Sequence, residues 1–205
     1  MLSEMYLKDF LDKTASSDAI PGGGSVAALS SSLAAALTIM VANLTIGKKK
    51  YANVNDEMLE VVKKLEIRKN EFVQLIDKDA NSFSSVLQAF KMPKDTDEEK
   101  SLRTEAIQDG MKYAAKVPLG VAIDTSKLFK SIEYIVINGN SNAVTDGLVA
   151  AMMARTAIKS ALYNVKINLS SIKDEAYVEE LTAQVQELDE FADKREKEIL
   201  ALSNL

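Results

Sequence analysis

The 205-residue sequence contains no cysteine and no histidine. Without cysteine the chain has neither disulfides nor a thiolate nucleophile, which fits a cytoplasmic setting. Without histidine it has no histidine general base, no Ser-His-Asp triad and no zinc site built from His and Cys, so we expect no metal. If the protein is an enzyme, proton transfer therefore falls to carboxylates, lysines, tyrosines or water.

The sequence also lacks an excess of positive charge. It has 25 Lys and Arg against 30 Asp and Glu, a net charge of −5, which argues against bulk nucleic-acid binding. The first 17 residues carry several charges in place of the apolar segment of a signal peptide. With 47% hydrophobic and 27% charged residues, we expect one soluble domain spanning 1–205.

Apolar residues recur at helical spacing along nearly the whole chain, so we predict an all-α helical bundle with long antiparallel helices. A first amphipathic helix is expected before Ser16. Long helices follow at about 25–46 and at 55–92, and a capping box at Thr96 and Glu99 opens the next one. Pro118 is expected to restart or kink the chain. The β-like run 132–137 has no partner strand, so we assign it to a helix. Two further helices are expected, one from about residue 143 and a last one after Ser171.

The longest feature is a run from 19 to 47 without Asp, Glu, Lys or Arg, which begins with Pro21-Gly22-Gly23-Gly24-Ser25. Glycines let the backbone adopt unusual dihedrals or lie close to another group. Where they open a helix, free N–H groups can receive an anion or a carbonyl. The glycines can also form a simple turn. The run is long enough for a membrane span, but its seven Ser, Thr and Asn residues favour a helix buried in a bundle.

Asp79 is the most informative carboxylate. It falls in an apolar stripe with Phe72, Ile76, Phe83 and Val86, spaced three or four residues apart. A carboxylate on a buried face is costly unless paired, and such groups are often functional. The alternative is an Asp that caps a neighbouring helix or pairs with a lysine.

Helix lengths predict which residues meet. Two antiparallel helices joined near 51–55 would place Asp79 level with Ser25, because both lie about 30–36 Å from the connection. Lys48 and Lys49 would then lie at the opposite end of the same chain. Asp146 is a second candidate acid, although acidic residues are favoured in a first helical turn in any case.

Four ordered motifs resemble the cyclodeaminase/cyclohydrolase family of folate one-carbon metabolism. They cover most of the chain and comprise Pro21 to Ala28, Met40 to Thr45 with Gly47 to Tyr51, Asp77 to Ala80 with Phe83, and Gly139-Asn140 with Asp146 and Asn164 to Leu169. The resemblance implies an all-α homodimer. Its substrates would be tetrahydrofolate derivatives, with no further cofactor.

Two reactions are implied by the resemblance. One hydrates 5,10-methenyl-tetrahydrofolate to the 10-formyl form, and the other cyclises 5-formimino-tetrahydrofolate with loss of ammonia. Bifunctional members carry a formiminotransferase domain ahead of this region. Only some twenty residues precede the glycines here, so we expect no transferase activity and place the cyclohydrolase first and the cyclodeaminase second. A folate-binding or scaffold protein without activity is the third reading.

The residues take the following expected roles. Asp79 is the acid/base and Asp146 the next candidate, while the glycines, Ser25 and Asn140 contact substrate. Lys48 and Lys49 hold the glutamate tail of folate, which can be polyglutamylated. A homodimer can bring the lysines of one subunit near Asp79 of the other. We expect neither a membrane nor a nucleic-acid partner.

Overall fold

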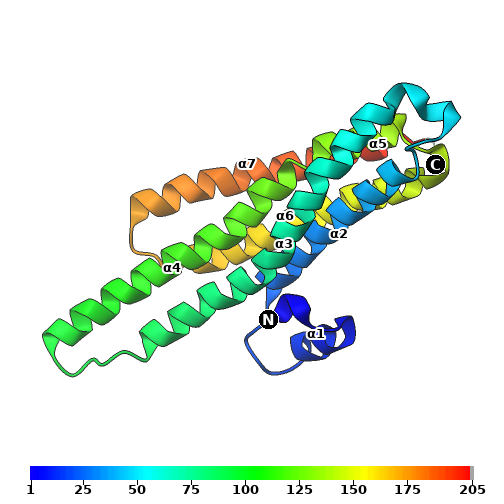
Figure 1. The fold of residues 1–205 in the computed structure, drawn as a ribbon. Coiled ribbons are helices and arrows are strands. Elements are labelled where there is room, and N and C mark those ends of the chain that lie inside the picture. The colour runs from blue at the N-terminus through cyan, green and yellow to red at the C-terminus, as the bar shows by residue number, and fades with distance from the viewer. Residues whose placement is uncertain (204–205) are drawn as a thin grey trace.

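The computed structural model describes residues 1–203, which form an elongated helical bundle with no strand in that range (Figure 1). The helices are α1 (Leu7–Thr14), α2 (Gly23–Asn43), α3 (Asn55–Phe90), α4 (Asp97–Ser126), α5 (Phe129–Asn138), α6 (Val144–Leu169) and α7 (Glu175–Leu200), with short 3-10 turns at Leu2–Glu4, Lys49–Val54 and Ser141–Ala143. The all-α prediction is confirmed.

Helix α2 is the centre of the bundle, packed against α3 on one side and α6 on the other. Its small residues allow close approach, and Ala27, Ala28, Ala34 and Ala35 are fully buried. By length and composition alone α2 could cross a membrane, but 67% of its most apolar window is buried inside the protein. That burial is typical of the core helix of a bundle.

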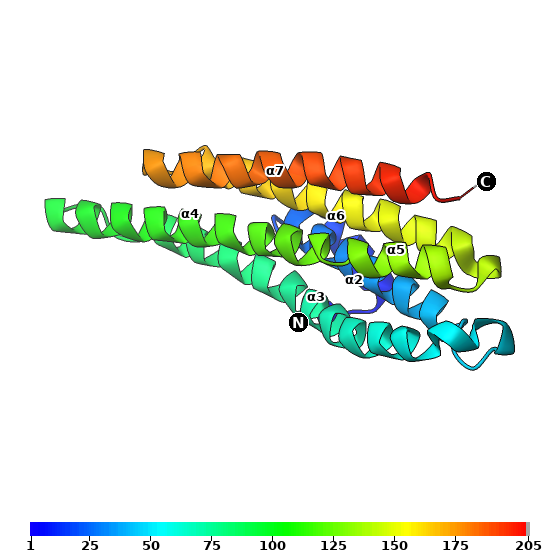
Figure 2. The same cartoon turned by 90° about the horizontal axis from the view of Figure 1, so that it is seen from above.

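Helices α3 and α4 form a long hairpin whose tip projects beyond the other helices (Figures 1 and 2). The prediction for α3 is nearly exact in its bounds, and the capping box that opens α4 is present in full. Thr96 accepts a hydrogen bond from the Glu99 N–H, and the Glu99 carboxylate accepts one from the Thr96 N–H.

The expectation that the chain restarts at Pro118 is wrong, because α4 runs through the proline to Ser126. Proline has no N–H, so it leaves the carbonyl of Ala114 without its helical partner. The side chain of Asn168 donates a 2.9 Å hydrogen bond to that carbonyl from α6. A side chain 54 residues away therefore lets the helix continue, and the short helix α5 begins only at Phe129.

The hydrogen bond from Asn168 to the Ala114 carbonyl leads to a prediction about stability. Asn168→Ala should lower the free energy of unfolding by about 1–3 kcal/mol, because a carbonyl next to the core loses its partner. In a Pro118→Ala background residue 118 supplies its own N–H, so the same substitution should cost much less. Denaturant unfolding of the four proteins in this double-mutant cycle measures the difference. An equal cost in both backgrounds would contradict the pairing.

The ends of the first two helices also differ from expectation. The first splits into a 3-10 turn and α1 because Met5 and Tyr6 are extended, and Asp77 accepts hydrogen bonds from the N–H groups of Leu2 and Ser3. Helix α2 spans 23–43 instead of 25–46. Gly47 adopts a left-handed conformation, with φ of 75°, four residues after α2 ends. The expected helix over 132–137 is confirmed as part of α5.

Candidate active site

The N-terminus of α2 meets the last third of α3 and the second half of α6 at a cavity of about 140 Å³. Its polar lining comes from Asp79, Ser82, Asn164 and Asn168, with the backbone of the three glycines 22–24 on one wall. The length argument that placed Asp79 level with the glycines is confirmed.

Asp79 bonds to the first turn of α2. Its Oδ2 lies 3.0 Å from the Ser25 hydroxyl, and the carboxylate also accepts from the Ser25 backbone N–H. That N–H belongs to the third residue of α2, one of the donors left free at a helix start. Gly22, at the N-cap position, has no side chain to satisfy it. The Asp79 carboxylate thus occupies the position expected for an anion at the N-terminus of α2, and in doing so it caps that helix.

Burial raises the pKa of Asp79 above its ordinary value, although the hydrogen bonds from Ser25 oppose the rise. The Ser25 hydroxyl is 3.0 Å from both Asp79 and the carbonyl of Ile76, yet it has one proton to donate. When Asp79 is protonated, it can donate to Ser25 while Ser25 donates to Ile76. When Asp79 is ionised, its carboxylate and the Ile76 carbonyl compete for that proton. Both protonation states are therefore accommodated, as an acid/base requires.

The glycines are needed for close packing. Gly47 is the only residue with positive φ among 1–203, so the glycine run does not use the left-handed region. A Cβ on Gly24 would overlap Oδ1 of Asp79 and lie 2.7 Å from Oδ2. A Cβ on Gly23 would lie 2.9 Å from the Asn164 amide nitrogen. Of the two uses of glycine expected from the sequence, close approach is the one observed.

Asn164 and Asn168 line the cavity from α6, but the sequence argument gave them no role. Their side-chain nitrogens bond to backbone carbonyls, Asn164 to Ser160 at 2.8 Å and Asn168 to Ala114 and Asn164 at 2.9 Å. They stand four residues apart on one helix face, a spacing visible in the sequence. Pro118 is the second signal, since a proline inside a helical pattern needs a partner for its freed carbonyl.

Four other candidates lie at the opposite end of α2. Lys48 and Lys49 are exposed beyond its C-terminus, about 30 Å from Asp79 along the helix axis. Asn140 is buried there, donating to the Leu44 carbonyl at 3.0 Å. Asp146 follows in the first turn of α6. Within one chain the two candidate acids, Asp79 and Asp146, are therefore not brought together.

A half-buried carboxylate beside helix-terminal N–H groups defines a class of helical protein able to move protons without histidine. Comparison with known proteins identifies the family. Residues 6–187 match the formiminotransferase-cyclodeaminase family, and the chain belongs to this family.

Two relatives and one solved structure show how far the similarity extends. Methenyltetrahydrofolate cyclohydrolase of Methylorubrum extorquens is 38% identical over 92% of this chain and 90% of its own length. Formimidoyltransferase-cyclodeaminase of Gallus gallus is also 38% identical over 90% of this chain, which spans 34% of that longer protein. The crystal structure of formiminotetrahydrofolate cyclodeaminase from Thermotoga maritima superimposes with a TM-score of 0.87. It has 29% identity, and the match covers 98% of this chain and 97% of that one.

Proposed function

We propose that the protein is a methenyltetrahydrofolate cyclohydrolase. The proposal rests on one observation above all: Asp79 of α3 is partly buried, has a raised pKa, and bonds to Ser25 at the start of α2. The relative with this activity in its name is similar over nearly its whole length, which supports the reaction assignment.

The chemistry follows from the site. Ionised Asp79 takes a proton from a water whose oxygen bonds to the carbon bridging two folate nitrogens. The resulting hydroxyl then loses its proton to solvent as it becomes the formyl carbonyl. As the bond from that carbon to N5 breaks, Asp79 returns its proton to N5. The sum is methenyl-folate plus water giving 10-formyl-folate and one proton.

The second candidate is formiminotetrahydrofolate cyclodeaminase, the activity named for the Thermotoga maritima structure. In this reaction the tetrahedral carbon also bridges two folate nitrogens, but the formimino nitrogen leaves as ammonia. The absorbance of methenyl-folate separates the two. We expect it to decay faster with enzyme than without. Efficient ammonia release from the formimino substrate, with methenyl decay at the uncatalysed rate, would reverse the order. Neither signal above background would indicate a protein without this activity.

We also propose that the site is completed by a second copy. Small-molecule sites commonly measure about 300–1,000 Å³, so 140 Å³ accommodates only part of a folate. Large apolar side chains are exposed on the neighbouring helices α2 and α6, namely Leu33 and Met40 on α2 and Val149 and Met152 on α6. Apolar surface of this kind is typical of a subunit interface.

Sedimentation at micromolar concentration tests the dimer. The wild type should sediment as a dimer, and Leu33→Glu should shift it towards monomer because a charge would be buried in the interface. Leu102→Glu is the matched control, since Leu102 is also about half exposed but lies on α4 away from this surface. A monomeric wild type, or equal effects of the two substitutions, would contradict the proposed interface.

We further propose that Lys48 and Lys49 hold the glutamate tail, reaching Asp79 of the other subunit. Replacing both with Ala should raise KM, by more for polyglutamylated folate than for the monoglutamate, while kcat changes little. Added salt should mimic the effect on the wild type because exposed charges are screened. Steady-state kinetics with the two substrates measures it. Equal losses of kcat with both would instead place a lysine beside the reacting carbon.

A further inference from the structure

A second cavity, of about 420 Å³, lies where α3, the junction of α4 with α5, and α7 meet. It shares no lining residue with the Asp79 site. On α3 its nearest lining residue, Arg68, is 11 residues from Asp79, or about 16 Å along the axis. The folate reaction proposed above makes no use of it.

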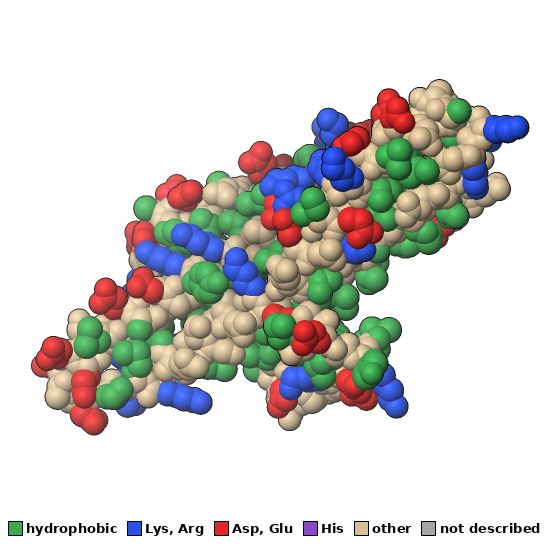
Figure 3. Space-filling view, viewed as in Figure 1, with side chains coloured by type: hydrophobic (Ala, Val, Ile, Leu, Met, Phe, Trp, Pro, Cys, Tyr) green, Lys and Arg blue, Asp and Glu red, His purple; other side chains and the backbone are tan. Residues whose placement is uncertain are grey.

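Positive charge dominates this lining. The basic residues are Lys64, Arg68, Lys127, Lys130 and Arg195, whereas Asp124 is the one acid among the lining residues described. Figure 3 shows Lys and Arg side chains gathered near the junction of α4 and α5, with acidic side chains among them. Such a cluster is unexpected on a chain with net charge −5.

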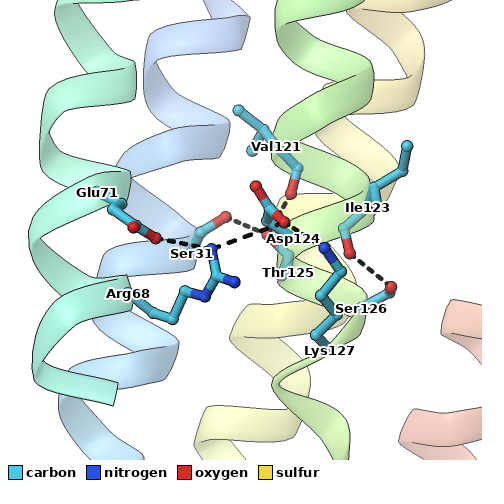
Figure 4. Close-up of polar contacts among 9 residues, drawn as sticks. All are labelled: Ser31, Arg68, Glu71, Val121, Ile123, Asp124, Thr125, Ser126 and Lys127. Carbon is cyan, nitrogen blue, oxygen red and sulfur yellow. Dashed lines mark hydrogen bonds and ion pairs between the residues drawn. The ribbon is translucent and has the colours of Figure 1, made fainter. Parts of the chain in front are cut away.

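Carboxylates neutralise part of the cluster. Arg68 lies between Glu71, at 2.7 Å, and Asp124, at 3.9 Å (Figure 4). Asp124 also binds Lys127 at 2.6 Å. Arg195 pairs in the same way, with Glu133 at 2.8 Å and Glu198 at 2.6 Å.

Charge and hydrogen-bonding capacity remain after these pairs form. Across residues 1–203, Lys64 and Lys130 have no acidic group within ion-pair distance, so both ammonium groups are unpaired. A guanidinium carries five N–H donors, and Arg68 and Arg195 use only some of theirs on carboxylates. The cavity therefore offers several donors to an anion.

The rest of the wall is apolar. Leu128 and Phe129 are 1% exposed, and Phe191 meets Phe129 edge to face with ring centroids 5.9 Å apart. Phe191 itself is 37% exposed, which leaves ring surface open to a ligand. Cations beside an aromatic wall suit a ligand that has anionic groups and an apolar or planar body.

We propose that this cavity binds a small organic polyanion, with two or more phosphate or carboxylate groups on an apolar or planar body. Its volume lies within the range of small-molecule sites. A nucleoside diphosphate and a short glutamate oligomer share this chemistry and come from different sources. The cavity would therefore be a ligand site separate from the reacting centre.

Isothermal titration at low ionic strength tests the proposal with three probes: ADP, tri-γ-glutamate and inorganic phosphate. We expect saturable binding of ADP or tri-γ-glutamate, tighter than that of inorganic phosphate. Because Lys48 and Lys49 are proposed to hold a glutamate tail, the tri-γ-glutamate binding that the Lys48→Ala/Lys49→Ala protein retains is the part assigned to this cavity. The probe that binds identifies phosphate or carboxylate as the preferred group. Lys64→Gln/Lys130→Gln should weaken binding by roughly tenfold or more, since charge-assisted hydrogen bonds are lost.

The control removes two lysines outside the cavity, Lys63→Gln/Lys116→Gln, and so makes the same change in net charge. It should bind as the wild type does, while Phe191→Ala should weaken binding of ADP. Thermal melts check that each variant is folded. The proposal is overturned if neither organic probe saturates, if inorganic phosphate binds as tightly, or if the control loses affinity equally.

Discussion

Asp79→Asn should lower turnover of methenyl-folate by roughly two to four decades. The amide keeps the shape of the side chain and can still accept the Ser25 N–H, so α2 stays capped. What it loses is the ability to take up and return a proton. Steady-state decay of methenyl absorbance, corrected for the uncatalysed rate, measures the loss.

The same substitution should not destabilise the protein at neutral pH, and this separates catalysis from capping. Burial raises the pKa of Asp79 in the folded state, so ionising it costs folding free energy. Its contribution to stability is greatest below the unfolded pKa and is lost as pH rises through the higher folded pKa. The Asn variant should therefore gain stability relative to wild type above that folded pKa. Denaturant unfolding at several pH values measures this.

Asp77→Asn is the matched control, two residues away on α3. Asp77 accepts bonds from Leu2 and Ser3 and does not line the cavity, so its loss should loosen the N-terminal segment with little effect on turnover. If Asp79→Asn folds normally and turns over near the wild-type rate, the acid/base role belongs elsewhere. Asp146 is then the next residue to replace.

Gly24→Ala should have the second largest effect. The new methyl group would occupy the position of the Asp79 carboxylate, which must move for α2 and α3 to keep their packing. Forced overpacking typically costs about 1–3 kcal/mol. Displacing a catalytic group by about 1 Å can cost roughly a hundredfold in rate. We expect both losses, measured by thermal unfolding and by turnover.

Gly120→Ala controls for the change from glycine to alanine within a helix. Gly120 lies in α4 and has no heavy atom within 4 Å of an added Cβ, so alanine should stabilise the protein by about 0.5–1 kcal/mol. Wild-type activity and stability in Gly24→Ala would mean that Asp79 has room to move. The close contact would then not hold the carboxylate in place.

Local patterns predicted the features that depend on neighbours in sequence. The apolar repeat of α3 and its short link to α2 were enough to place Asp79 beside Ser25, because helix rise converts residue counts into lengths. The capping box at Thr96 could also be predicted, because its two residues lie only three positions apart in the sequence. The continuation of α4 through Pro118 could not be predicted, since it depends on Asn168 from a helix distant in the sequence.

The sequence also could not show which use of glycine applies. Both a turn and a close approach favour glycine, and only the position of Asp79 against Gly24 distinguishes them. Likewise, asparagine is common in turns, so the sequence indicated only a turn residue at Asn140. Its bonds to Thr45 and Leu44, from the other end of α2, became visible only in the fold. Whether it contacts substrate stays a prediction.

The pH dependence of kcat/KM for methenyl-folate, in wild type and Asp79→Asn, tests the central claim most directly. A base with a raised pKa should make the wild-type rate fall as pH drops through a value above 3.8, the ordinary pKa of an aspartate. The Asn variant should be slower by two decades or more and should lack that inflection. The same inflection at a similar rate in both proteins would contradict the assignment of Asp79 as the acid/base.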